Sequence, residues 1–295
     1  MREADLPEPS GRLFFFSAGA LFVGEGLVNE PHRHFTASIS FALTGRLRVR
    51  TRSRNWWDTR GVAFAPNVEQ AMDAPSGTVV ILQIDPETED YRRIAALFGA
   101  GRVSELDQAL CEKLVAVSRS ELEQGVPDPK RLWSAIVGAL AVPGREAPRR
   151  DPRIDQLLRM LKDCYLDPPP AAALAKRVGL SEVRIVHLFS QQMGLPMRRY
   201  LLWLRLRSVI YSLALGQTLT EAAHAAGFAD SAHMSRTFRG MFGLAPSLLL
   251  KENRKLQIEF VLPSSADEAG PHYEFDLARL REIELMQAEK RNRRA

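Results

Sequence analysis

The C-terminal third of the sequence contains an internal duplication, and this feature constrains the fold more than any other. At a shift of 49 residues, the apolar and glycine positions of 185–195 recur in 234–244. The matched pairs are Ile185 and Met234, Phe189 and Phe238, Met193 and Phe242, Gly194 and Gly243, and Leu195 and Leu244. At a shift of 48, Ala175 and Gly179 recur as Ala223 and Gly227. Two copies of one small structural unit are therefore expected.

Each copy has the residue order of a helix-turn-helix unit. A short alanine-rich helix comes first, followed by a glycine that accepts a positive φ and a serine or aspartate that caps a second helix. The second helix has an apolar residue at every fourth position, as a single buried face requires. The sequence therefore predicts helix-turn-helix units at 171–193 and 219–241.

The second helix of each unit is expected to bury its apolar stripe and to expose the opposite face. That face holds small, polar and basic side chains, namely Val183, Arg184, Val186, His187 and Gln191 in the first copy and Ser231, Ala232, His233, Ser235, Arg236 and Arg239 in the second. Such side chains suit the major groove of DNA. The amphipathic run 197–215 predicts a stiff helix that holds the two units at successive major-groove faces, about 34 Å apart.

These motifs carry a resemblance to a known family. The range 154–246, about a third of the chain, resembles the DNA-binding domain of the AraC/XylS transcription regulators. The residues that carry it are Leu180-Ser181, Phe189, Gly194, Tyr200, Arg205-Leu206-Arg207, Gly227-Phe228-Ala229-Asp230, Ser235-Arg236-Thr237-Phe238 and Phe242-Gly243-Leu244-Ala245-Pro246. The resemblance implies base readout by Val183, Val186 and His187 in the first unit and by Ser231, Ala232, His233 and Arg236 in the second, with Arg184 and Ser235 adjacent.

Three basic residues near this surface have competing interpretations. Arg239 fits a phosphate contact or a solvated charge better than a base contact, and His224 fits a structural role on its supporting helix. For Arg184, base and backbone contacts are equally open. The chain also departs from the family pattern, because residues 246–251 replace the usual aromatic-arginine ending, which leaves the role of the last helix open.

The charge distribution favours a polyanionic partner. Between Asp151 and Lys255 there are 15 lysines and arginines against 8 acidic residues, whereas the whole chain has a formal net charge of +5. Cys111 and Cys164 fall in predicted amphipathic helices, which favours buried thiols over a disulfide. No apolar run approaches the ~18 residues of a membrane span, and residues 1–11 do not resemble a leader sequence. A cytoplasmic protein without a membrane partner is therefore expected.

The fold class expected is α+β and multidomain. Short apolar runs broken by turn residues predict a β-sandwich or barrel over 13–85, and helical periodicity follows over 104–142. We therefore predict an N-terminal domain at 1–142, a proline-rich linker at 143–151 and an all-α double helix-turn-helix domain at 152–255. The range 256–295 is expected to be a tail, in which 276–292 forms either an added helix or part of a solvated, disordered end.

The N-terminal domain resembles a cupin barrel, the usual sensor module of the same family, in the segments 31–34, 44–45 and 61–66. In metal-binding cupins, two histidines of the first motif, a carboxylate and a later histidine hold a divalent ion. Here His32 and His34 are present, but no acid follows until Asp58, and Gln70 stands where the later histidine is expected. We therefore predict no metal and no cofactor, and regard the two histidines as candidate ligand-binding residues at a pocket mouth or as plain surface residues.

The tryptophans at 56–57 are expected to pack the barrel end rather than to cover a ligand. Taken together, the sequence predicts a sequence-specific transcription regulator that is not an enzyme. Its expected partners are double-stranded DNA, RNA polymerase, a small-molecule effector and a second copy of the chain as a homodimer. One alternative is a cupin-type metalloenzyme with an accessory DNA-binding domain. Another is a structural nucleoid protein that binds DNA without sequence preference.

Overall fold

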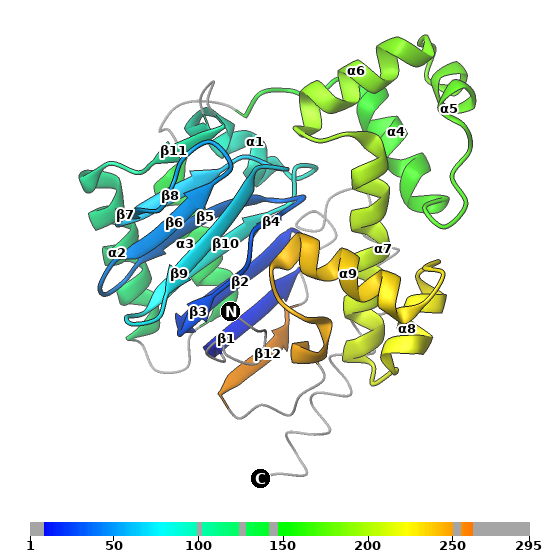
Figure 1. The fold of residues 1–295 in the computed structure, drawn as a ribbon. Coiled ribbons are helices and arrows are strands. Elements are labelled where there is room, and N and C mark those ends of the chain that lie inside the picture. Colours follow the sequence, from blue (N-terminus) through cyan, green and yellow to red (C-terminus); the bar gives the residue numbers. More distant parts are fainter. Residues whose placement is uncertain (1–8, 99–101, 124–127, 142–146, 250–254, 262–295) are drawn as a thin grey trace. The chain divides into compact units, whose positions relative to one another are not determined.

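The computed structural model describes residues 9–98, 102–123, 128–141, 147–249 and 255–261 (Figure 1). The chain divides into two compact units. The β unit comprises the described residues of 1–147 together with 239–244 and 255–261, and the helical unit comprises 148–238 and 245–249. Among the described residues, no helix is long and apolar enough to cross a membrane.

The strands of the β unit form two sheets. The larger sheet has seven strands in the order β11-β8-β5-β10-β2-β1-β12. They are β11 Val103–Glu105, β8 Gly61–Phe64, β5 Ala37–Ala42, β10 Val79–Ile84, β2 Gly19–Glu25, β1 Ser10–Phe16 and β12 Leu256–Phe260. The smaller sheet has the order β3-β9-β6-β7, and β4 also pairs with β9. These strands are β3 Leu27–Val28, β9 Glu69–Ala74, β6 Leu47–Thr51, β7 Trp57–Thr59 and β4 His32–Arg33.

Burial along the strands explains this arrangement. On β6, Leu47 and Val49 are buried and Arg48 between them is exposed, which is the alternation of a sheet with one face in the core. On β5, every residue is buried, because this strand lies inside the larger sheet and α2 contacts it. The strand pairing gives two sheets and not one closed barrel, which corrects the expected barrel closure while keeping the α+β class.

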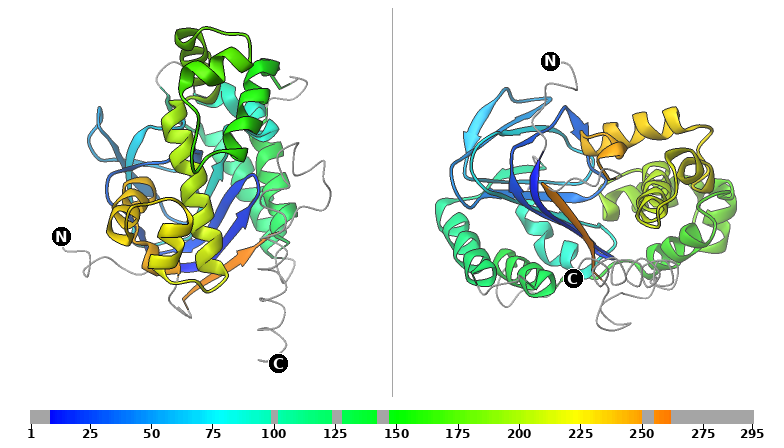
Figure 2. Two further views of the ribbon diagram at one scale, coloured as in Figure 1. Left: turned by 90° about the vertical axis from the view of Figure 1, so that its right-hand side faces the viewer. Right: turned by 90° about the horizontal axis from the view of Figure 1, so that it is seen from below.

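Four helical segments complete the β unit: α1 Glu89–Ile94, η2 Ala95–Phe98, α2 Gln108–Leu122 and α3 Pro129–Leu140. The two longer helices α2 and α3 lie side by side at the sheet, as Figure 2 shows. The carboxylate of Asp107 caps α2, and that of Asp128 caps α3. Residues 104 and 105 were expected to begin the helical segment but belong to the edge strand β11 instead, because they pair with β8.

The strand β12 also differs from the sequence-based prediction, which assigned residues from 256 onward to a tail. It pairs in parallel with β1, with Leu256 opposite Gly11 and Phe260 opposite Phe15. The rings of Phe15 and Phe260 stack with their centroids 5.2 Å apart. Backbone pairing and apolar burial together place this segment in the β unit. The predicted helix 276–292 lies outside the described residues.

The helical unit contains α4 Pro152–Asp163, α5 Ala171–Arg177, α6 Glu182–Met193, α7 Met197–Ala214, α8 Leu219–Ala225, η3 Pro246–Leu249 and the first part of α9 Ser231–Phe242. In α4 the apolar residues Ile154, Leu157, Leu158 and Leu161 form one fully buried stripe. The helix α7 contacts α4, α6 and α8, so it forms the centre of this unit.

Candidate nucleic-acid interface

The turns between α5 and α6 and between α8 and α9 have the same backbone geometry. Gly179 and Gly227 adopt φ values of 69° and 74°, in the left-handed region that favours glycine. The next residue in each copy closes the turn, because the Leu180 N–H donates to the Ala175 carbonyl at 2.9 Å and the Phe228 N–H donates to the Ala223 carbonyl at 2.9 Å. The duplication in the sequence is therefore a duplication of structure.

The caps of the second helices explain why the repeat shift changes from 48 to 49 residues. In the first copy the cap is Ser181, two positions after Gly179, and its Oγ accepts a hydrogen bond from the N–H of Arg184 at 3.3 Å. In the second copy the cap is Asp230, three positions after Gly227, and its Oδ1 accepts a hydrogen bond from the N–H of His233 at 2.6 Å. The second turn thus contains one extra residue before its cap. The hydrogen bond from the His233 N–H also lowers the pKa of Asp230, which keeps the cap ionised.

The inner faces of α6 and α9 carry the apolar stripes expected from the sequence. Ile185, Phe189 and Met193 are completely buried, and Met234 and Phe238 are buried at the matching positions of α9. This burial fixes the rotation of each helix about its own axis, so the residues on the opposite face are directed away from the core.

The outer face of α6 carries two exposed apolar side chains beside polar ones. Val183 is 81% exposed and Val186 is 43% exposed, although valine is usually buried. Arg184 and His187 are exposed on the same helix. Apolar side chains that face water next to a cation and an imidazole suit contact with the methyl groups and the donor or acceptor atoms of base edges in a major groove.

The outer face of α9 is smaller and more basic. Ala232, His233 and Arg236 are exposed, whereas Ser231 and Ser235 are half-buried. The His233 ring meets the Phe228 ring edge-on, with 5.5 Å between centroids, which restricts its orientation. Each of the nine predicted DNA-contacting residues therefore lies on α6 or α9 with its side chain exposed or half-buried.

Carboxylates of the helical unit are engaged at helix ends. The Asp151 carboxylate accepts hydrogen bonds from Arg153, which lower its pKa to about 2, and Asp155 lies 3.1 Å from Arg150. Glu221 completes a capping box with Thr218. Negative charge is thus held at the helix starts, and the exposed outer faces of α6 and α9 carry arginines.

Arg205 on α7 has a role that the sequence did not reveal. Its guanidinium donates to the carbonyls of Tyr165, Leu166 and Gly227 at 3.3, 3.0 and 3.4 Å. One side chain therefore connects the end of the α4 region with the turn of the second helix-turn-helix unit. The sequence signals were the match of Arg205 to the family pattern and its place in an amphipathic helix, which is also typical of a solvated surface residue, and neither signal indicated these contacts.

Arg207 is buried on α7, although an arginine of an amphipathic helix is usually exposed. Its guanidinium lies 5.8 Å from the ring centroid of Trp203, within the range of a cation–π contact. The helix α7 consequently buries residues around much of its circumference, as a central helix must. By contrast His224, expected to be structural, is exposed on α8.

The candidate ligand-binding residues His32 and His34 are buried inside the β unit, so the alternative of plain surface histidines was wrong. His32 Nδ1 lies 2.6 Å from the Glu30 carbonyl oxygen, so this nitrogen carries the proton and donates. His32 Nε2 then accepts from His34 Nε2 at 2.8 Å. Burial lowers the pKa of His32 to about 4, and burial together with the neighbouring His32 lowers the pKa of His34.

The surroundings of these histidines differ from the metal-binding cupin pattern. The next polar neighbour of His34 is Gln83, whose Nε2 lies 3.2 Å from His34 Nε2 and donates to Ser38 Oγ. Within the described ranges, no group of three or more histidine, cysteine or acidic side chains is placed to hold a metal ion.

Trp56, at the end of the β6–β7 loop, and Trp57, the first residue of β7, both lie beside arginines. The guanidinium of Arg50 lies 5.3 Å from the Trp56 ring, and that of Arg54 lies 4.1 Å from the Trp57 ring. Trp57 is half-buried but Trp56 is 37% exposed, so the expected packing of the barrel end is not observed for Trp56.

Comparisons with known proteins agree with this geometry. Residues 174–252 match the family model described as a helix-turn-helix domain. The HTH-type transcriptional activator RhaS of Citrobacter koseri is 34% identical over 101 residues, which cover 34% of this chain and 36% of RhaS. RhaS of Escherichia fergusonii is 35% identical over 97 residues, covering 32% and 35%. The chain thus matches about a third of the length of these curated relatives.

Two solved structures of ToxT from Vibrio cholerae are similar to most of the chain. One, from strain O395, has a TM-score of 0.50 at 10% identity and covers 77% of this chain and 94% of ToxT. The other, an apo form of a ToxT variant from strain SCE256, has a TM-score of 0.50 at 14% identity and covers 78% and 96%. At this identity the likeness shows a shared fold.

Proposed function

We propose that this chain is a sequence-specific DNA-binding transcription regulator of the AraC/XylS type, because its helical unit matches the helix-turn-helix family model and the DNA-binding part of RhaS. The observation that carries the proposal is the paired geometry of α6 and α9. Each is a second helix behind the same glycine turn, with a buried apolar stripe and an exposed outer face. A pair of such faces has the form of two recognition helices.

The two helices read bases by different chemistry in this proposal. On α6, Val183 and Val186 contact thymine methyl groups, while His187 donates or accepts at a base edge. On α9, Arg236 binds a guanine through two hydrogen bonds in this proposal, and Ser231, Ala232 and His233 contact the bases nearest the helix start. Arg184, Ser235 and Arg239 contact adjacent base edges or phosphates.

The spacing of the two units follows from α7. This helix has 18 residues, which at 1.5 Å per residue gives a length of about 27 Å. A helix of that length joins two units that bind successive major-groove faces, one duplex turn apart, on one side of the DNA. Arg205 restrains this spacing, because it connects α7 to the turn before α9.

The remaining parts of the proposal concern control. We assign the sensing of a small-molecule effector to the β unit, self-association as a homodimer to the β unit with its helices α2 and α3, and a contact with RNA polymerase to the DNA-bound form. An effector acts only if it binds two arrangements of the protein with different affinity.

The test is selection of binding sites from random duplex DNA by the full chain, followed by titration of the selected duplex and a scrambled duplex at several salt concentrations. The expected result is a selected sequence with two half-sites about one helical turn apart and a salt-dependent preference over the scrambled duplex. Equal affinity for both duplexes at moderate ionic strength would contradict sequence-specific regulation and favour a structural nucleoid protein.

A further inference from the structure

Arginines occupy every second position along β6 and the loop that follows it. Between residues 46 and 54 the sequence has five arginines and no acidic residue. We call this set the arginine row, and its members are Arg46, Arg48, Arg50, Arg52 and Arg54. On β6 the residues between them, Leu47 and Val49, are buried, so the arginines of the strand lie on the opposite, outer face of the smaller sheet. At about 3.3 Å per residue, neighbouring members are about 6.6 Å apart along the strand.

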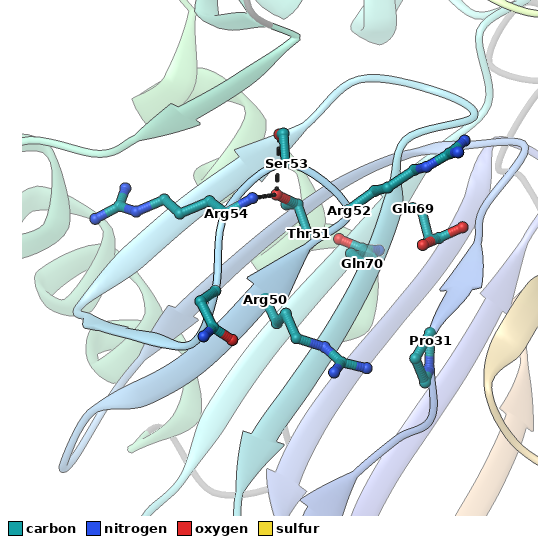
Figure 3. A pocket seen from close by; sticks show the side chains of 9 residues that line it. Pro31, Arg50, Thr51, Arg52, Ser53, Arg54, Glu69 and Gln70 are labelled. Atoms are coloured by element: carbon teal, nitrogen blue, oxygen red, sulfur yellow. Dashed lines mark hydrogen bonds between the residues drawn. The ribbon is translucent and has the colours of Figure 1, made fainter.

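The loop after β6 brings three members of the row together. Arg50, Arg52 and Arg54 line one cavity of about 450 Å³ at the end of the strand, as Figure 3 shows. The carboxylate of Glu69 also lines this cavity, but it is paired with Arg33 at 2.8 Å. Positive charges that are gathered on one surface repel each other. An anion that binds between them removes this repulsion.

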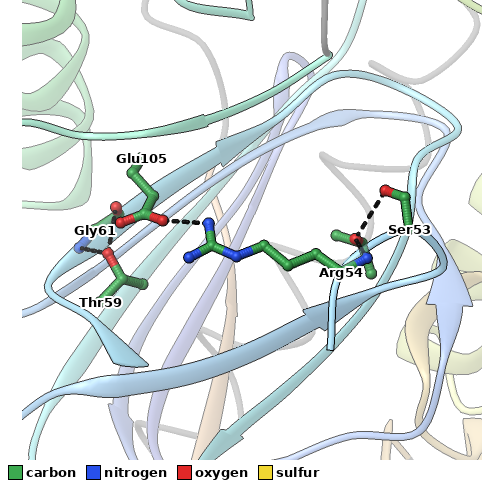
Figure 4. A network of polar contacts seen from close by, with 6 residues as sticks. Ser53, Arg54, Thr59, Gly61 and Glu105 are labelled. Atoms are coloured by element: carbon green, nitrogen blue, oxygen red, sulfur yellow. Dashed lines mark hydrogen bonds and ion pairs between the residues drawn. The ribbon is translucent and has the colours of Figure 1, made fainter. Parts of the chain in front are cut away.

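Acidic side chains neutralise two members of the row. Arg48 lies 3.8 Å from both Asp58 and Asp73, which are the residues opposite it on β7 and β9. Arg54 is paired with Glu105 of β11, as Figure 4 shows. These pairs account for part of the charge of the row and leave the charges of the other three members.

The remaining three arginines have no acidic partner within the described ranges. Neither Arg46 nor Arg50 nor Arg52 forms an ion pair there. The residue opposite Arg50 on β9 is Ala71, which carries no charge. The ring of Trp56 lies 5.3 Å from the Arg50 guanidinium, which orients this group without neutralising it. The outer face of the smaller sheet thus presents several unpaired guanidinium groups in a line.

We propose that the arginine row is a second DNA-contacting surface, which binds phosphates of the duplex backbone and reads no bases. Planar guanidinium groups match phosphate oxygens through paired hydrogen bonds. Phosphate contacts position a protein on a duplex and carry no sequence information directly. The proposal rests on the proposed function for the identity of the polyanion, and it adds the β unit to the parts of the chain that hold DNA.

The extended shape of the row favours DNA over the other anionic partners. Duplex DNA carries one negative charge for about every 1.7 Å of its axis, so it offers a phosphate to each unpaired member of the row at once. A small anion in the cavity neutralises only the members that line it. The surface of a folded protein usually mixes both signs of charge, which makes it a poorer match for a line of arginines.

The experiment measures the affinity of the full chain for DNA at several salt concentrations, with and without the substitutions R50Q/R52Q. The duplex carries the selected site and several helical turns of DNA on both sides, and a scrambled duplex has the same length. Each phosphate contact contributes about 0.9 to the slope of log affinity against log salt concentration, so the variant is expected to have a slope smaller by about 2. Its affinity should fall by a similar factor on both duplexes, because phosphates are the same in every sequence.

Two matched variants separate charge from structure. R50K/R52K keeps both charges, so its salt slope should equal that of the wild type even if its affinity is lower. R93Q/R131Q is the control, because it removes two exposed arginines on α1 and α3 of the same unit, and its slope should be unchanged. Melting temperatures of all three variants verify that each chain is folded.

The proposal is overturned if R50Q/R52Q keeps the wild-type slope, or if R93Q/R131Q lowers the slope by the same amount. Polyglutamate that binds the wild type but not R50Q/R52Q, with an unchanged slope on DNA, would identify an acidic protein as the partner instead. Inorganic phosphate that raises the melting temperature of the wild type alone, again with an unchanged slope, would identify a small anion.

The two duplexes keep this test separate from the proposed function. Equal affinity of the wild type for the selected and the scrambled duplex would contradict sequence-specific regulation, and the salt slope would still report on the row. A preference for the selected duplex together with an unchanged slope in R50Q/R52Q would refute only the role of the arginine row.

Discussion

At the scale of single residues, the outer face of α6 carries exposed apolar side chains, which a helix that only faces water does not need. Val183 and Val186 expose apolar surface, and a lysine or glutamate at either position would make the isolated helix more soluble. The inner face holds the helix in place through Ile185 and Phe189, so neither valine is required for packing. Exposed valines on a fixed helix are explained if they lose their contact with water when DNA binds.

We expect His187→Ala and Arg236→Ala each to weaken binding to the selected DNA site by about 1–3 kcal/mol, because each removes hydrogen bonds to a base edge. Each variant should also relax the preference at one base pair. Affinities for the selected site and for sites changed at single base pairs would be measured by titration. Arg60→Ala, which removes an exposed charge in the β unit, is the control. Weakening that is uniform across all DNA sequences would identify phosphate contacts instead.

The buried histidine pair predicts a pH dependence of stability. Burial disfavours the charged ring of His32 and lowers its pKa from 6.5, the ordinary value for histidine, to about 4 in the folded chain. The unfolded chain therefore takes up a proton as the pH falls through 6.5, and the folded chain does so only near pH 4. Stability is complete above pH 6.5 and falls by up to about 3 kcal/mol as the pH approaches 4.

This prediction is tested by urea unfolding of the wild type and of His32→Gln between pH 7.5 and 4. The variant should show a shallower loss of unfolding free energy with falling pH, whatever its stability at pH 7.5, so a destabilised but folded variant still gives an answer. The same pH slope in both proteins would rule out His32 as the titrating group.

At the scale of elements, α7 and its Arg205 hold the helical unit together. Arg205 donates to two carbonyls after α4 and one carbonyl in the turn before α9. Lysine has the same charge but a single nitrogen, so it cannot reach three carbonyls that lie in different directions. The planar guanidinium is therefore the feature that this position needs.

We expect Arg205→Lys to reduce affinity for DNA with both half-sites more than affinity for DNA with one half-site, since the restraint between the two units is weakened. Arg205→Ala should have a larger effect and should also lower the unfolding free energy by about 1–3 kcal/mol, because carbonyls lose their donors. Arg159→Lys on α4 is the matched control, because that arginine is exposed. Equal losses on one-site and two-site DNA would mean that Arg205 does not set the spacing.

At the scale of the whole molecule, the β unit is built from segments that are not continuous in the sequence. Residues 255–261 follow the helix-turn-helix domain in the sequence but belong to the β unit, where β12 extends the larger sheet beyond β1. The edge strand β1 is thereby covered, which removes an open row of backbone donors and acceptors. The β unit is complete only when the C-terminal part of the chain has been made.

We expect a chain that ends at Lys255 to unfold at a lower urea concentration than a chain that ends at Val261. The shorter chain loses the buried side chains of Leu256, Phe260 and Val261, each worth about 1.5–3 kcal/mol. The longer chain is the control, since it retains β12 and lacks only the residues after it. Equal unfolding midpoints would show that β12 contributes nothing to the β unit.

The sequence alone determined the helix-turn-helix units, their turns and the faces of their second helices. These features depend on interactions between residues at most about five positions apart, such as the left-handed glycines, the caps and the spacing of apolar residues. Gly179, Ser181 and Ile185 therefore occupy in the fold the turn, cap and core positions that the sequence predicts for them. Two exposed valines were also predictable, because the buried stripe decides the opposite face.

The tertiary structure decided what depends on residues far apart in the chain. Pairing of β12 with β1 joins residues separated by more than two hundred positions, and no local sequence pattern predicts which strand β12 pairs with. Burial of His32 and Arg207, the three carbonyls at Arg205 and the pairing of Arg48 with Asp73 arise in the same way. Each of these features forms only where several segments of the chain come together. The environment of such a side chain therefore depends on which segments surround it in the fold and not on its neighbours in the sequence.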